Sequence, residues 1–239
     1  MIIFPEDKVA VIIPTYNESS SIDILLKRIY KILPHAKIFI VDDSMLTENK
    51  KLKEKTKNSR VKVISRMQKL GRGSAVMVGF REALKDKDIK YFFEMDADLS
   101  HLPAEFPIFF EKIKKENADL VIGSRYLDGS ATIDWPKWRI IMSKLANLYL
   151  NILLNLKLTD YTDGFRLYTR NAVEFLTKEK FKTSGFILLS ESSYKLRLNK
   201  FVITEVPIHF VDRKYGKSSM GPRELFYSLF GILKVRFIK

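Results

Sequence analysis

Two aspartates separated by one small residue, Asp96-Ala97-Asp98, are the residues whose type and spacing most clearly predict chemistry. They follow the apolar run Tyr91-Phe92-Phe93, which predicts that both carboxylates lie at a strand end where water is partly excluded. Carboxylates held this close repel each other unless a cation lies between them. Mg²⁺ and Mn²⁺ accept such oxygens and complete their shells with substrate phosphates, so the pair predicts a metal site for a phosphorylated substrate.

The same spacing occurs twice, so the surroundings of each pair decide its meaning. Asp86-Lys87-Asp88 stands at the end of a predicted helix among lysines, where we expect a solvated turn. In the other pair, the small side chain of Ala97 lets a ligand approach the backbone. The alternative for that pair is a surface turn that binds no metal.

Short apolar runs alternate with helical patterns through the first half of the chain. We expect strands at 8–13, 37–41, 61–64, 91–95 and 119–122, helices near 20–33, 47–57, 73–86 and 104–116, and later helices near 137–156 and 186–198 with a strand near 202–208. This order is typical of an α/β fold with a mostly parallel sheet flanked by helices. Ligands of such sheets bind beyond the carboxyl ends of the strands.

The residues after the first two strands suit a nucleoside. Pro14 fixes the backbone, Tyr16 offers an aromatic face that can stack on a base, and Glu18 offers a carboxylate for ribose hydroxyls. Asp42 and Asp43 could accept from a base N–H or from the ribose. The alternatives are a proline turn before a helix for the first group and a helix N-cap for the second.

Two loops combine glycine with cations. Residues 69–75 open a helix with two glycines and two cations, which suits a phosphate bound through backbone N–H groups, although a plain glycine turn fits as well. Residues 212–219 place three cations beside a glycine, which predicts a flap that closes over a pyrophosphate. A solvated turn is the alternative.

The predicted helix at 137–156 has an unusual pattern. Its polar residues recur every four positions, at Arg139, Ser143, Asn147, Asn151 and Asn155, and nearly all others are apolar. Such a helix could lie partly in a bilayer interface and present Arg139 and Ser143 to a lipid headgroup. The alternative is a core helix with a solvated edge. The last helix, from Pro222, has a similar pattern.

Composition limits the partners. Lysine and arginine outnumber aspartate and glutamate by 42 to 28, a net charge of +14, which predicts an anionic partner: nucleic acid, an anionic bilayer or a phosphorylated substrate. No cysteine is present, which excludes disulfides and fits a reducing cytosol. Because a signal-peptide pattern and a run of roughly 20 apolar residues are both absent, we expect a cytoplasmic protein with peripheral membrane contact.

Together these motifs resemble glycosyltransferase family 2, and within it the dolichol-phosphate mannose synthases and related polyprenyl-phosphate glycosyltransferases. The broad family is marked by segments 9–18, 41–43, 96–101 and 123–126, and the polyprenyl-phosphate branch by Trp135-Pro136, Arg139, Ser143, 162–166, 206–208 and 213–216. Three departures are the turn 44–47 without its usual glycine and aspartate, Leu102 in place of a common aspartate, and Ser219 in place of a usual lysine.

The resemblance implies a GT-A nucleotide-sugar-binding fold in one catalytic domain. We expect a nucleotide-sugar-binding half at 1–125, an acceptor-binding half with the flap at 126–221, and an amphipathic helix at 222–239. Pro14, Tyr16, Glu18, Asp43 and Asp98 would hold the nucleoside, with Asp42 and Ala97 as further donor-site candidates. Asp96 and Asp98, with Ser100 nearby, would bind Mg²⁺ or Mn²⁺, and Arg213, with Lys217, the donor diphosphate. Arg125, Arg139 and Ser143 would bind a lipid phosphate, and Asp98, Arg125 and Arg139 are the expected catalytic residues.

The implied reaction is the inverting transfer of a hexose, mannose from GDP-mannose, onto a polyprenyl phosphate at the cytoplasmic membrane face. The acceptor phosphate is largely dianionic at neutral pH, so no general base is needed. Alternatives are glucose transfer from UDP-glucose, transfer to a hydroxyl with Asp163 or Glu191 as base, and a non-catalytic module that binds nucleic acid. We expect no nucleic-acid partner, and a small membrane-anchoring subunit is a further partner candidate.

Overall fold

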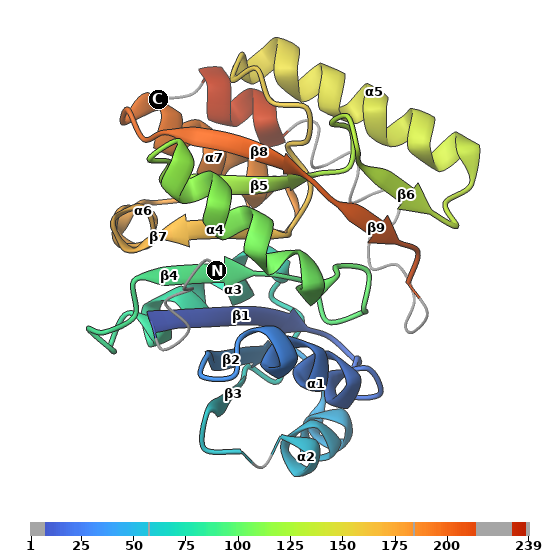
Figure 1. Ribbon diagram of the computed structural model, residues 1–239, viewed down its shortest axis with the longest axis vertical. Helices are drawn as coiled ribbons and strands as arrows, with labels where there is room; N and C mark the ends of the chain where they lie inside the picture. Colours follow the sequence, from blue (N-terminus) through green and yellow to red (C-terminus); the bar gives the residue numbers. More distant parts are fainter. Residues whose placement is uncertain (1–7, 57, 184, 214–230, 238–239) are drawn as a thin grey trace.

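A seven-stranded sheet with helices on both faces forms the centre of the molecule (Figure 1). The computed structural model describes residues 8–56, 58–183, 185–213 and 231–237. The strands are β1 (Val9–Thr15), β2 (Lys37–Asp42), β3 (Val61–Ser65), β4 (Tyr91–Glu94), β5 (Leu120–Ser124), β6 (Ala131–Ile133), β7 (Arg166–Thr169), β8 (Ile203–Pro207) and β9 (His209–Val211). The helices are α1 (Ile22–Ile32), α2 (Leu46–Lys55), α3 (Arg72–Ala83), the 3₁₀ turn η2 (Pro103–Glu105), α4 (Phe106–Lys115), α5 (Lys137–Leu154), α6 (Arg170–Lys178) and α7 (Ile187–Leu198).

The order of strands in the sheet is β3-β2-β1-β4-β7-β5-β8. All neighbours are parallel except β7, which runs antiparallel to both β4 and β5. The predicted α/β fold with a mostly parallel sheet is therefore confirmed. The sequence did not predict β7, because it has four residues and directly follows a polar turn.

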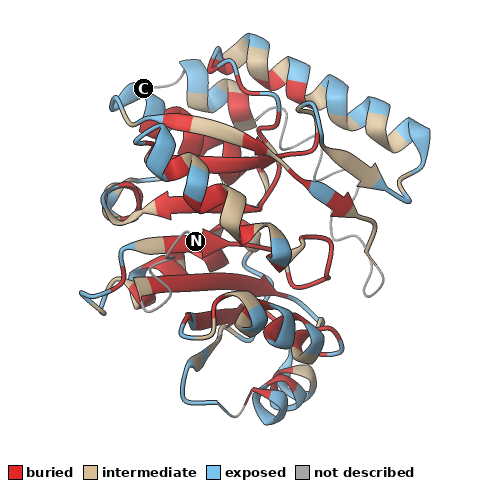
Figure 2. Cartoon of the chain, in the orientation of Figure 1, coloured by how far each residue is buried: buried red, intermediate tan, exposed pale blue. Residues whose placement is uncertain are grey.

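Each face of the sheet has its own apolar core. All seven residues of β1 are buried, and alternate side chains point to opposite faces, so Val11 packs in the core with α1 and α4 while Ile12 packs in the core with α3. Gly79 lets α3 approach the sheet closely, since a Cβ there would lie 2.6 Å from Ile12. Figure 2 shows the central strands almost wholly buried.

An aromatic cluster supports the end of β4. The ring of Phe93 lies 4.3 Å from that of Phe106, 5.6 Å from that of Phe109 and 6.0 Å from that of Phe165, centroid to centroid. Removal of one such buried ring typically costs about 3–5 kcal/mol. The turn that begins two residues after β4 is thus built on a rigid base.

A small second sheet pairs β6 with β9 in parallel. Beyond it, α5 runs along the outside of the molecule (Figure 1). Residues 231–237 are helical, as predicted, while the other residues of the helix predicted from Pro222 lie outside the described ranges. In the part of the chain that the structure describes, none of the helices combines the length and apolarity needed to cross a bilayer.

Candidate active site

The carboxyl ends of β1 and β4 bring three carboxylates close together. Burial raises the pKa of Glu18 to about 8, with further upward contributions from the charges of Asp98 and Asp96. The N–H of Tyr16, 3.4 Å from a Glu18 oxygen, and the charge of Arg213 lower it only partly. Negative charge is thus concentrated at the carboxyl ends of these central strands, where the sequence predicted a bound cation.

The turn after β4 fixes one oxygen of Asp98. Its Oδ1 accepts from the backbone N–H of Ser100 at 3.0 Å and from the Ser100 hydroxyl at 2.5 Å. Its Oδ2 lies 3.8 Å from Nε of Arg213, the predicted diphosphate ligand. Ala97 is fully buried, and Leu99 has a φ of 68°, which turns the chain sharply. Ser100 therefore supports Asp98, and its predicted contact with a metal stays a prediction.

Arg72, from the predicted glycine-containing segment 69–75, is the counter-ion of Asp96. Its Nε donates to Asp96 at 2.7 Å, its NH1 pairs with Glu94, and its NH2 lies 3.4 Å from the carbonyl of Gly164. Burial raises the pKa of Asp96, but several lowering effects, first among them the charge of Arg72, together hold that pKa below its usual value. The predicted phosphate contact of this segment stays a prediction; the structure gives the segment a carboxylate partner.

His101 holds the backbone of the same turn. Its Nδ1 accepts from the N–H of Asp96 at 3.0 Å, its Nε2 lies 3.4 Å from Asp163, and its ring stacks on Phe165. Burial lowers the pKa of His101 and the charge of Asp163 raises it, with a net increase. The N–H of Asp96 nevertheless requires a lone pair on Nδ1, so we assign the neutral ring with its proton on Nε2.

Two arginines lie close to the ring of Trp135. The guanidinium of Arg139 lies 3.9 Å from the ring centroid of Trp135, and that of Arg125 lies 5.3 Å away. Arg139 donates to Asp212 at 2.8 Å, and its side chain is 27% exposed. The structure therefore brings together two of the three predicted acceptor ligands. Ser143 follows Arg139 by one helical turn and is partly exposed.

Arg125 is more enclosed than the sequence suggested. Its Nε and NH2 bind both oxygens of Asp160, at 2.7 and 2.9 Å, and NH2 also donates to Thr162 at 2.7 Å. Asp163 lies 3.4 Å from the same Nε. Because these carboxylates already balance its charge, Arg125 primarily holds the loop at 160–163, and its predicted contact with the acceptor stays a prediction.

The Asp42-Asp43 pair is occupied by protein donors. Asp42 is buried and accepts from Thr15, Ser44 and Asn49. Asp43 binds both Nε and NH2 of Arg66, and the N–H of Leu70. The N-cap alternative is wrong, since Met45 is the N-cap of α2. Both carboxylates stiffen the donor side, and their direct contact with a nucleoside stays a prediction.

The remaining donor candidates differ in exposure. Pro14 is buried within β1, whereas Tyr16 is 40% exposed with the ammonium of Lys69 5.2 Å from its ring centroid. Such an open ring suits stacking on a base. Lys217 lies outside the described residues.

Comparison with known proteins decides the family. Residues 10–177 match the sequence model of the family described as Glycosyl transferase family 2. This chain belongs to glycosyltransferase family 2. The resemblance predicted from its motifs is thereby confirmed, and so is an enzymatic role.

Two relatives of this glycosyltransferase align with most of its length. It is 32% identical over 231 residues to the polyprenol monophosphomannose synthase of Mycolicibacterium smegmatis, which covers 95% of this chain and 86% of that protein. It is 35% identical over 217 residues to the undecaprenyl-phosphate mannosyltransferase of Micrococcus luteus, which covers 90% and 88%.

Solved structures share the fold of this glycosyltransferase. The glucosyl-3-phosphoglycerate synthase of Mycobacterium tuberculosis, in complex with Mn²⁺, UDP and phosphoglyceric acid, has a TM-score of 0.70 at 17% identity over 98% of this chain and 80% of that one. The same enzyme with Mg²⁺ and UDP has a TM-score of 0.68 at 16% identity, over 98% and 80%. The predicted GT-A architecture is confirmed.

Gly164→Ala tests the pairing of Arg72 with the carboxylates. A Cβ at this position would lie 2.0 Å from Nη2 of Arg72 and 2.7 Å from its Cζ, so the guanidinium must shift, and we expect the shift to weaken its pairing with the buried Glu94. Loss of one partner of a buried ion pair costs about 3–5 kcal/mol, and we expect urea unfolding to show a loss of that order. Gly231→Ala, whose Cβ would meet Thr183 at an ordinary 3.4 Å, is the control. An unchanged urea midpoint for Gly164→Ala would contradict the pairing.

The pH dependence of metal binding tests the carboxylate cluster. Because the pKa of Glu18 is raised to about 8 in the folded protein, its contribution to stability is present below the unfolded pKa and lost as pH rises through about 8. A bound cation favours the ionised form. We therefore expect the increase in Tm caused by Mn²⁺ to grow between about pH 6 and about pH 9. Glu18→Gln should flatten this profile. An equally steep profile in that variant would show that Glu18 is not the group responsible for the pH dependence.

Proposed function

We propose that this glycosyltransferase transfers mannose from GDP-mannose to the phosphate of a polyprenol, with inversion at the anomeric carbon. The observation that carries the proposal is the partly exposed Arg139, which stacks on Trp135 and pairs with Asp212, the residue before the Arg213 that lies near Asp98. A guanidinium placed in this way suits a phosphate acceptor. Both curated relatives, at 32% and 35% identity, are named for mannosyl transfer to a polyprenyl phosphate.

The donor side fits a divalent cation. Asp96 and Asp98 offer oxygens at a position where Glu18 adds further negative charge. No set of three or more such residues in the described ranges forms a metal site by itself, and Mg²⁺ and Mn²⁺ commonly use one or two carboxylates together with substrate phosphates. When bound, such a cation neutralises charge on the departing diphosphate. Arg213, beside Asp98, adds a second positive charge there.

The acceptor side needs to position a nucleophile but not to deprotonate it. A phosphate monoester is largely dianionic at neutral pH because its second pKa is near 6. Arg139 and Ser143 would hold the phosphate for attack, while Arg125, through Asp160, fixes the loop beneath it. Positioning of this kind can supply much of the rate enhancement.

Transfer to a hydroxyl is disfavoured because both candidate bases are enclosed. Asp163 is 2% exposed and accepts from the N–H of Phe165. Glu191 is fully buried and accepts from the N–H groups of Lys182 and Thr183 and from the Thr183 hydroxyl. Neither carboxylate is open to an acceptor hydroxyl.

The outward face of α5 suits a membrane surface. Six apolar side chains on it are each at least half exposed: Trp138, Ile141, Met142, Leu145, Leu148 and Ile152. Two members of the polar stripe face inward instead, since Asn147 accepts from the N–H of Tyr161 and Asn151 from its hydroxyl. The core-helix alternative with a solvated polar edge is therefore wrong. We propose peripheral binding at the cytoplasmic face through this apolar side, which leaves room for a membrane-anchoring subunit.

A transfer assay tests the proposed function directly. The protein is incubated with Mn²⁺ or Mg²⁺, a polyprenyl phosphate and, one at a time, labelled GDP-mannose and UDP-glucose. We expect label from GDP-mannose to enter the lipid phase. Label from UDP-glucose would establish the glucosyltransferase alternative, and no transfer from either donor would contradict the proposal.

Arg139→Ala tests the acceptor site. Loss of a charged hydrogen-bonding partner of the phosphate should lower kcat/KM for the polyprenyl phosphate about 10- to 100-fold, with donor binding unchanged. Lys137→Ala, which removes an exposed cation at the start of the same helix, is the matched control. Equal activity of the two variants would exclude Arg139 from the acceptor site.

Asp212→Asn tests whether Asp212 competes with the acceptor. Its carboxylate accepts from Arg139 at 2.8 Å, and the same guanidinium also lies 3.9 Å from the ring centroid of Trp135. Removal of this internal anion should lower KM for the polyprenyl phosphate by roughly 3- to 10-fold. A raised KM would instead show that Asp212 is needed to orient Arg139.

Substitution on α5 tests the membrane face. Leu145→Glu with Leu148→Glu places charge at two exposed positions, so we expect the fold to persist and partition onto lipid vesicles to fall by about tenfold or more. Ile24→Glu with Leu46→Glu, two exposed apolar positions on α1 and α2, makes the same change in charge and should leave partition unaltered. Similar vesicle binding by both double variants would contradict a role for α5.

A further inference from the structure

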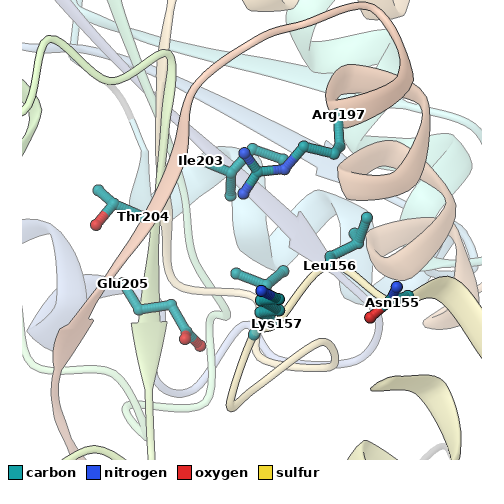
Figure 3. Close-up of a pocket in the computed structure, with 8 residues that line it drawn as sticks. Asn155, Leu156, Lys157, Arg197, Ile203, Thr204 and Glu205 are labelled. Atoms are coloured by element: carbon teal, nitrogen blue, oxygen red, sulfur yellow. The ribbon is translucent and has the colours of Figure 1, made fainter. Parts of the chain in front are cut away.

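A pocket lies at the other end of α5 from Arg139 (Figure 3). It has a volume of about 360 Å³. Its lining includes the buried side chains of Leu156, Leu158 and Ile203 and the charged side chains of Lys157, Arg197 and Glu205. A rise of 1.5 Å per residue puts it roughly 24 Å along the helix from Arg139, so it is separate from the acceptor site.

The charges of the pocket favour an anion. Lys157 and Arg197 are exposed, and within the described ranges neither forms an ion pair with a carboxylate. The Glu205 carboxylate is already engaged, since it accepts from the N–H groups of Thr159 and Asp160 and from the Thr159 hydroxyl. The lining of the pocket thus combines two cations, Lys157 and Arg197, with one carboxylate, Glu205, whose oxygens already accept from three donors.

The backbone around Lys157 is held in an uncommon conformation. Its φ is 59°, in the left-handed region that residues other than glycine rarely adopt. Two hydrogen bonds maintain this turn: Lys157 N–H donates to Asn151 at 3.2 Å, and Leu156 N–H donates to the Tyr161 hydroxyl at 3.1 Å. Leu156 and Leu158, the residues on either side of Lys157, are buried, so the fold fixes the backbone position from which the Lys157 side chain extends.

Exposed apolar residues lie next to pocket residues in the sequence. Ile152 is 72% exposed and lies three residues before Asn155 of the pocket lining; Leu198 and Val202 are exposed and adjoin Arg197 and Ile203. Exposed apolar side chains therefore lie near both cations, on α5, at the end of α7 and before β8. A phosphate carried on an apolar or glycerol body matches this combination better than a free sugar does.

We propose that this pocket binds the phosphate group of a phosphate ester between the ammonium of Lys157 and the guanidinium of Arg197. Guanidinium and ammonium groups are the usual protein ligands of phosphate. The ester is either the headgroup of a membrane phospholipid or a soluble phosphate ester. The site is distinct from the acceptor site and does not depend on the assignment of Arg139.

The test compares two double variants of equal charge in the full chain. Lys157→Ser with Arg197→Ser removes the pocket cations, and Lys50→Ser with Lys53→Ser removes two exposed cations from α2. Binding of glycerol 3-phosphate is measured by titration calorimetry, and binding of phosphatidylglycerol vesicles by flotation. Transfer to a short-chain prenyl phosphate in detergent is a control that both variants should pass.

We expect the pocket variant to lose on the order of tenfold in affinity for at least one probe, while the α2 variant binds like the unsubstituted protein. Loss with glycerol 3-phosphate identifies a soluble ester as a sufficient ligand, and loss with vesicles alone identifies a lipid headgroup. Equal losses in the two variants, or none in either, would overturn the proposal. Because these readouts measure binding, they stand apart from any failure of the transfer assay.

Discussion

The site depends on the balance of negative charge at the carboxyl ends of β1 and β4. Glu18, Asp96 and Asp98 share a small volume there, and burial with mutual repulsion raises the pKa of Glu18 to about 8. Arg72 compensates Asp96, and Arg213 lies beside Asp98. A divalent cation with a nucleoside diphosphate would complete this balance, because the cation binds the carboxylates and its excess charge is met by the phosphates.

The rest of the molecule holds these charges in place. The aromatic cluster at Phe93 supports the turn from below, and His101 fixes its backbone through the N–H of Asp96. Strand β9 connects the donor and acceptor sides: the N–H of Val211 donates to the carbonyl of Ser100, while Asp212, the next residue, accepts from Arg139. A shift of β9 would therefore move groups in both the donor site and the acceptor site.

Sequence patterns predicted what depends on local order, and failed where a partner lies far along the chain. Buried apolar runs located the parallel strands, and the apolar run before Asp96-Ala97-Asp98 correctly placed these residues in the turn after β4. The pairing of Arg72 with Asp96, 24 positions apart, has no local signal. The sequence correctly predicted that the polar residues of α5 share one side of the helix. It could not predict that Asn147 and Asn151 point inward, because this depends on their hydrogen bonds with Tyr161. Likewise, three protein donors occupy Asp42, which the sequence alone assigned to the donor.

The most direct measurement is anomalous X-ray diffraction from a crystal of the protein with Mn²⁺ and GDP. We expect one manganese peak between Asp96 and Asp98, about 2.1 Å from a carboxylate oxygen and next to the diphosphate. Arg213 should contact the same diphosphate. A nucleotide bound elsewhere, or a manganese peak away from both aspartates, would show that Asp96 and Asp98 do not form the metal site.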